Sequence, residues 1–174
     1  MEAGAVGFTT SRTVNHKDSQ GNPTPSLTAT ADELWGIAKG VGEAGRGVFE
    51  IVADFEDLET EFAMVREMSA QTGRPMSVTV GQFDARPDDW KRMLELIAEA
   101  NAEGIPMTAQ VAPRPVGVIM SLESTVHPFM QNKPYTDLLS LPLHERVVKL
   151  RNKEHRQAII DDGHTNFDFA RVFA

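Results

Sequence analysis

The chain has 174 residues, a net charge of −8 and no cysteine. Its length is typical of a single domain with a sizeable core, and its acidic balance argues against a nucleic-acid surface, which needs clustered Lys and Arg. The lack of cysteine excludes disulfides, thiol catalysis and cysteine-based zinc sites.

No apolar run approaches the roughly 18–20 residues that a membrane-spanning helix needs. The start, "MEAGAVGF", has no basic stretch followed by an apolar one, so it does not read as a signal peptide. We therefore expect a protein with no membrane association and a cytoplasmic location, which the absence of cysteine also fits.

The first predicted element is a buried strand in "AGAVGFTTSRT", and the loop "VNHKDSQGNPTPS" follows it. Three further units then share one build: a helical pattern, a glycine, a short apolar strand and a polar end. Gly45, Gly73 and Gly104 open the stretches "GRGVFEIVADF", "GRPMSVTVGQFD" and "GIPMTAQVAPR". This repetition predicts alternating helices and strands.

Helical periodicity supports the three segments before these glycines. Thr28 or Thr30 is expected to cap the first helix, which Gly45 ends in a left-handed conformation. The second helix, from about 58 to 72, and the third, from about 88 to 103, each place apolar residues on one face. The predicted buried positions are Phe62, Val65, Met68 and Ser69, then Trp90, Met93, Leu94, Ile97 and Ala98.

Strands separated by helices pair in parallel with right-handed crossovers, so the predicted fold is α/β. Residues 1–114 form repeated β/α units, and residues 115–174 form a loop and short-helix segment of the same domain, with helices broken at Pro142. The sheet is either open or part of a (β/α)8 barrel, which usually needs about 250 residues. We expect an incomplete barrel of about four strands, with free edges and an apolar inner face that drive self-association.

Parallel α/β proteins carry their sites at the carboxyl ends of the strands. Acids, amides and two arginines follow the predicted strands and could hold a small anionic, amide-type ligand, since guanidinium groups suit carboxylates. The alternative is that polar residues simply end strands where the chain meets water. The candidate ligand-binding residues are Arg12, Glu50, Gln82, Gln110 and Arg114, with Asp54 and Asp84 nearby.

Glu50 is the one catalytic candidate, because it sits inside the apolar run "VFEIV", where an acid needs a partner. The five histidines, at positions 16, 127, 144, 155 and 164, show no metal-binding spacing, so no metal ligand is predicted. Ser11 and Ser77 have no visible histidine and acid partners for nucleophilic catalysis.

Several stretches nevertheless resemble the amidohydrolase superfamily, and within it the N-acyl-D-amino-acid deacylases, or D-aminoacylases. The resemblance runs from about Gly4 to Asp162, and "GAVGFTTSR" and "QVAPRPVG" are its most specific parts. It implies a metal-dependent (β/α)8 barrel in which zinc-activated water hydrolyses an amide C–N bond. The chain would correspond to roughly the fourth to seventh strands, as a piece of a longer protein.

The departures from that family matter equally. The His-x-His or His-x-Asp pair of the first barrel strand and the aspartate of the last are absent from this sequence. In the deacylases the fifth strand ends in a metal-binding histidine, and the matching position in this sequence is Glu50. The sixth strand of the deacylases also supplies a histidine, but the matching stretch "SVTVGQ" contains none. The resemblance therefore transfers no metal ligand, although zinc is expected in a complete member.

Three functional hypotheses remain open. The first is a partial amidohydrolase-like domain of a hydrolase acting on N-acyl amino acids or similar amides, inactive as this chain. The second is a non-catalytic module of the same fold that binds a small ligand or assembles with a partner, either another copy or the remainder of a longer chain. The third is a metal-free enzyme with Glu50 as general base, which lacks a visible partner to tune it.

Overall fold

The computed structural model describes residues 1–83, 85–114 and 117–165. The chain divides into two compact units. The first comprises Met1–Asp18 and Asn22–Val116, and the second Ser19–Gly21 and Gly117–Ala174. The repeated β/α units lie in the first unit, and the short helices of the C-terminal segment lie in the second.

The first unit contains one parallel sheet in the order β1-β2-β3-β4. The strands are β1 (Gly7–Arg12), β2 (Val48–Ala53), β3 (Met76–Thr79) and β4 (Met107–Gln110). Neighbouring strands run parallel in each of the three pairs. The α/β prediction is therefore confirmed: four parallel strands alternate with helices in an open sheet, the arrangement of part of a (β/α)8 barrel.

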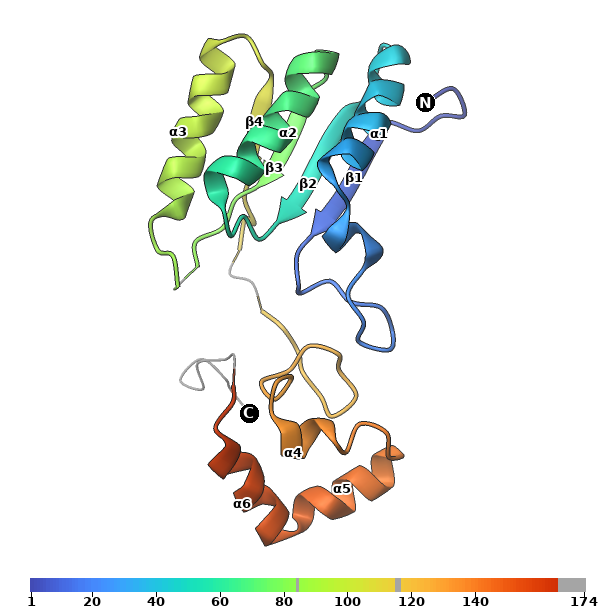
Figure 1. Cartoon of the computed structure of the whole chain (residues 1–174), viewed down its shortest axis with the longest axis vertical. Coiled ribbons are helices and arrows are strands. Elements are labelled where there is room, and N and C mark those ends of the chain that lie inside the picture. The colour runs from blue at the N-terminus through green and yellow to red at the C-terminus, as the bar shows by residue number, and fades with distance from the viewer. Residues whose placement is uncertain (84, 115–116, 166–174) are drawn as a thin grey trace. The chain divides into compact units, whose positions relative to one another are not determined.

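Helices α1 (Ala31–Glu43), α2 (Leu58–Thr72) and α3 (Asp89–Ala102) connect these strands, and a short 3-10 helix, η1 (Pro25–Thr28), precedes α1. All three α-helices cover the same face of the sheet (Figure 1), as right-handed crossovers in sequential strand order require. Thr30, and not Thr28, caps α1 by accepting the Glu33 N–H at 3.3 Å. Gly73 ends α2 with a φ of 63°, a left-handed conformation that glycine adopts without strain.

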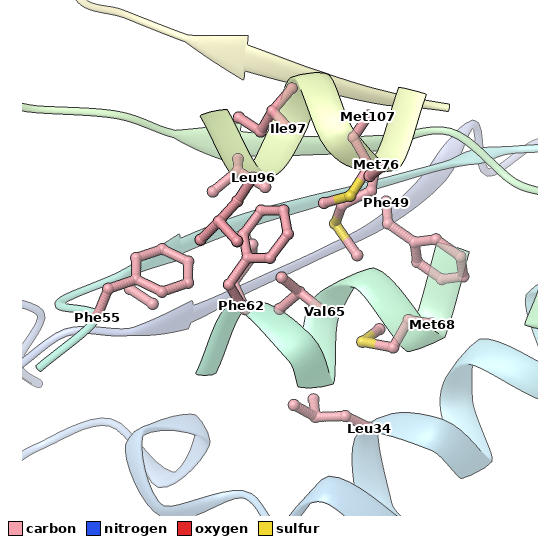
Figure 2. Packing of buried hydrophobic residues seen from close by; sticks show 14 of the residues in the cluster. Leu34, Phe49, Phe55, Phe62, Val65, Met68, Met76, Leu96, Ile97 and Met107 are labelled. Atoms are coloured by element: carbon pink, nitrogen blue, oxygen red, sulfur yellow. The ribbon is translucent and has the colours of Figure 1, made fainter. Parts of the chain in front are cut away.

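The core of the first unit lies between these helices and the sheet. Figure 2 shows side chains from β2, β3 and β4 meeting those of the helices in one apolar cluster. Phe62 and Val65 of α2 are almost fully buried in it. The predicted apolar face of α2 is confirmed, since Phe62, Val65, Met68 and Ser69 are its buried residues.

The buried face of α3 differs from the prediction in its rotation. Met93 and Ile97 are buried as expected, and the helix also buries Leu96 and Ala100. Of the other predicted positions, Trp90 is half-buried, and Leu94 and Ala98 are exposed. Leu94 and Leu96 lie on opposite sides of the line through Met93 and Ile97, so either can complete an apolar stripe. Leu96 is the leucine that packs against the core in the folded unit, and Leu94 faces solvent.

The second unit contains three helices, α4 (Lys133–Thr136), α5 (Leu143–Arg151) and α6 (Lys153–Asp162). Asn132 is buried and connects two of them: its side-chain N–H₂ donates to the Ile159 carbonyl at 2.8 Å, and its side-chain oxygen accepts the Tyr135 N–H at 3.1 Å. Pro142 immediately precedes α5, as the sequence predicts. Within the described part of the chain, no helix has both the length and the apolar character that a membrane crossing demands.

Candidate functional site

One face of the sheet carries no helix from the described residues of the first unit, and most of its side chains are polar. Because side chains alternate along a strand, the residues between the buried Phe49, Ile51, Met76 and Val78 point to this face. Strand register places Thr9, Glu50, Ser77 and Thr108 in one row across all four strands. We call the following set the open face: Thr9, Ser11, Glu50, Ser77, Thr79, Thr108 and Gln110.

This composition corrects the expectation of an apolar inner face. On β2 this face carries Val48 and Val52 beside Glu50, whereas β3 and β4 contribute hydroxyl and amide groups. Hydroxyl and amide side chains satisfy their hydrogen bonds with water or with a polar ligand. The face therefore needs no hydrophobic cover, and the argument that it drives association does not hold.

Glu50 lies near the centre of the open face, on β2 between Thr9 and Ser77. Its side chain is half-buried, and no described residue forms a hydrogen bond or ion pair with it. Because it faces away from the helix-covered core, water can solvate the carboxylate in place of the expected protein partner. Within the strands it is the only ionisable group on this face.

The two predicted glutamines occupy different surroundings. Gln110, at the end of β4, lies on the open face, and its side-chain oxygen accepts a hydrogen bond from the Ser77 hydroxyl at 3.3 Å. Gln82 follows β3, is exposed, and donates to the Pro87 carbonyl at 3.4 Å. Only Gln110 therefore shares the face of Glu50 within a strand.

The two predicted arginines do not meet Glu50 on that face. Arg12 pairs in register with the buried Ala53, which places it on the helix-covered side, where its guanidinium donates to the Ala29 carbonyl. Arg114 is exposed beyond the end of β4. Asp84, the acid predicted beside Gln82, lies outside the described residues.

The structure forms one contact that the sequence did not reveal. The Ser11 hydroxyl oxygen lies 2.6 Å from Nδ1 of His16, so Ser11 does have a histidine partner, contrary to expectation. Ser11 is half-buried at the carboxyl end of β1, and His16 is exposed in the loop that follows. The signal available in the sequence is the polar turn "RTVN" between them, which reverses the chain over the end of the strand.

Asp54, which directly follows β2, forms two hydrogen bonds to that turn. One carboxylate oxygen accepts the Thr13 hydroxyl at 2.5 Å, and the other accepts the Val14 N–H at 2.8 Å. Arg86 in turn donates to the carbonyls of Asp54 and Phe55 at 2.7 and 2.6 Å. The carboxyl ends of β1 and β2 are thus fixed to each other by hydrogen bonds.

The described residues do not fit a metal site. No group of three or more histidine, aspartate or glutamate side chains lies close enough together to hold an ion in residues 1–83, 85–114 and 117–165. On the open face Glu50 is the single carboxylate, the Asp54 oxygens are both engaged, and Nδ1 of His16 is bonded to Ser11. No metal-dependent step can therefore be derived from this part of the chain.

Among the cavities that the described residues line, one borders the carboxyl end of β3 and another lies in the second unit. One of about 30 Å³ beside Asp54, Phe83 and Trp90 has room for about one water molecule. The other, of about 560 Å³, lies within the second unit among Leu122, Phe129, Tyr135 and Ile159. The lining of the second is mainly apolar, with Asn132, Arg156 and His164 among its polar members.

His127 is buried beside this larger cavity. Its Nδ1 accepts the Phe129 N–H at 3.1 Å, and its ring contacts that of Tyr135 with centroids 4.8 Å apart. Burial lowers the pKa of His127 below its ordinary value, and the nearby Arg146 guanidinium adds to the effect. Burial also raises the pKa of Tyr135, so the phenol stays neutral at neutral pH.

The stability of the second unit should therefore fall in acid. In the unfolded chain His127 takes up a proton near pH 6.5, whereas the folded unit resists protonation. Stability is fully present above that pH and decreases as the pH drops below it. Urea unfolding at pH 7 and pH 5, followed by the absorbance of Tyr135, the chain's single tyrosine, measures the loss.

A His127→Gln variant should lose much of this pH dependence, while the exposed His144→Gln variant should keep it. Equal pH slopes for the parent chain and His127→Gln would show that His127 does not cause the effect. The comparison uses unfolding midpoints, so a uniform loss of stability in one variant does not obscure the slope.

A scan against protein-family models matches residues 1–174 to one family, described as the Amidohydrolase family. Neither the search of curated proteins nor the search of solved structures returned a match. The family match covers the four strands of the first unit and the helices of the second. It supports the superfamily part of the resemblance and does not test the deacylase branch.

Proposed function

Because the chain belongs to the amidohydrolase family, we propose that it forms part of a hydrolase of amide C–N bonds whose substrates are N-acyl amino acids. The open sheet provides the parallel strand ends on which such a site is built. We further propose that this polypeptide alone does not catalyse the reaction. Zinc, when bound in a complete family member, would supply the activated water.

One observation supports the proposed inactivity: Glu50 is the only ionisable side chain within the strands of the open face. Amide hydrolysis needs an activated water and a donor for the leaving amine. Glu50 has no described partner to orient it, and no cluster of metal-binding side chains accompanies it. A single unpaired carboxylate does not provide both functions.

The test is to purify the full chain, supply one equivalent of zinc, and measure bound metal and amine release. N-acetyl derivatives of D- and L-amino acids serve as substrates. We expect far less than one zinc per chain after desalting, and no amine release above that of buffer. Stoichiometric zinc together with chelator-sensitive amine release would overturn the proposed inactivity.

A second candidate is a non-catalytic module that binds a small amide-type ligand. The Ser77–Gln110 hydrogen bond and the surrounding hydroxyls favour it, since these groups can exchange their mutual bonds for bonds to a ligand. The unpaired Glu50 carboxylate disfavours an anion centred on this face, so an anionic group would have to reach Arg114 beyond β4. Saturable binding without turnover, lost in Gln110→Ala, would support this function over the first.

For either function we propose that the chain pairs with further strands, from another copy or from additional chain. Within the described sheet β1 and β4 are the edge strands, and edge strands present unpaired N–H and C=O groups. The polar open face leaves these edges as the surfaces most prone to association.

A further inference from the structure

The Ser11–His16 pair plays no part in the amide hydrolysis proposed above, and its geometry is that of a nucleophile with its base. The hydroxyl oxygen and Nδ1 are separated by 2.6 Å, a normal to short hydrogen-bond distance. In the neutral histidine tautomer with its proton on Nε2, Nδ1 accepts the hydroxyl proton. A base within this reach is the requirement for activating a serine hydroxyl.

The turn that carries His16 is held by several hydrogen bonds. Thr13 is buried and donates its hydroxyl to Asp54, and the Val14 N–H donates to the same carboxylate. The His16 N–H donates to the Thr13 carbonyl at 3.3 Å, and the Thr24 N–H donates to the His16 carbonyl at 3.4 Å. The backbone on both sides of the imidazole is therefore anchored, which keeps the base near Ser11.

The pair is also accessible from solvent. Ser11 lies on the open face, which no helix covers in the first unit, and the His16 side chain is exposed at the strand end. Ser77 lies on the same face, but its hydroxyl donates to Gln110 and has no histidine partner. Ser77 is therefore a matched comparison: it is a serine on the same sheet face without a base.

We propose that Ser11 is a catalytic nucleophile activated by His16, and that the pair takes acyl groups from activated esters. The Ser11 oxygen forms a bond to the carbonyl carbon while its proton passes to Nδ1 of His16. The bond from that carbon to the leaving oxygen then breaks, and the imidazolium returns the proton to the departing alcohol. Water hydrolyses the resulting ester of Ser11, releasing a carboxylic acid and restoring the hydroxyl.

An alkyl fluorophosphonate tests this chemistry directly, because it stops after the first step. The Ser11 oxygen bonds to phosphorus, fluoride leaves, and the proton passes through His16 to solvent. We expect a covalent adduct on Ser11 of the full chain, located by tandem mass spectrometry, and no adduct on Ser77. The labelling rate should fall about 100-fold in His16→Ala, the scale of general-base catalysis.

His16→Gln separates proton transfer from hydrogen bonding, because the amide oxygen accepts a hydrogen bond but is not a base. We expect it to label as slowly as His16→Ala, and we expect free imidazole to restore part of the rate in His16→Ala. An absent Ser11 adduct, or a rate unchanged in both His16 variants, would overturn the proposal. Tryptophan fluorescence, which reports on Trp35 and Trp90 of the first unit, checks that each variant is folded.

Discussion

Replacing Phe62 with alanine is expected to lower the free energy of unfolding of the first unit by about 3–5 kcal/mol. The side chain is 2 % exposed and projects from α2 into the cluster between the helices and the sheet (Figure 2). The substitution removes a buried ring and leaves a cavity that rigid neighbours fill only in part. Urea unfolding followed by tryptophan fluorescence measures the change, since both tryptophans lie in this unit.

Phe83→Ala is the matched control, because the same ring is deleted at a position that is 53 % exposed. A change within about 0.5 kcal/mol is expected there. If the two variants were destabilised equally, the helix-covered face of the sheet would not be the main core of the unit.

Asp54→Ala is expected to destabilise the first unit by about 1–3 kcal/mol, because it leaves the buried Thr13 hydroxyl and the Val14 N–H without their acceptor. It should also free the turn that positions His16. We therefore expect slower fluorophosphonate labelling of Ser11 in this variant even under conditions in which it is fully folded. Urea unfolding and labelling rates together measure both effects.

Glu56→Ala provides the control, since Glu56 is an exposed acid two residues along the chain. Its removal should change neither unfolding nor labelling beyond error. Asp54→Ala acting on stability alone, with an unchanged labelling rate, would show that the carboxylate does not position His16. Equal stability losses in Asp54→Ala and Glu56→Ala would indicate a general effect of lost charge instead.

The polar composition of the open face changes how assembly of this domain should be understood. An apolar face would have to be buried, so any partner with a complementary apolar surface could cover it. A hydroxyl-lined face tolerates water, so the proposed association would use the backbone groups at the β1 and β4 edges of the described sheet. Those groups pair only with another strand in register, which is a more specific requirement.

The family assignment and the candidate residues differ in how far the sequence could predict them. The superfamily was recognisable from the strand and loop sequences, and the family match over residues 1–174 confirms it. Each of the five ligand-binding candidates follows or lies in a predicted strand. That criterion does not say which sheet face each side chain occupies, and the structure places Glu50 and Gln110 on one face and Arg12 on the other.

The sequence by itself determined the order and type of the elements of the first unit. Apolar spacing, the Thr30 cap and the glycines at the helix ends are local signals, and the strands and helices they predict are present. Three features depended on contacts between distant residues. These are the side of α3 that is buried, the face on which Arg12 lies, and the approach of His16 to Ser11.

The physical reason is the same in each case. Helical and strand periodicities define faces relative to an element's own axis, but only packing against other elements decides which face is covered. Leu94 and Leu96 satisfy the helical pattern equally well until the sheet selects one of them. The turn between Ser11 and His16 likewise contacts a residue distant in the sequence: Asp54, which follows β2, accepts hydrogen bonds from the Thr13 hydroxyl and the Val14 N–H.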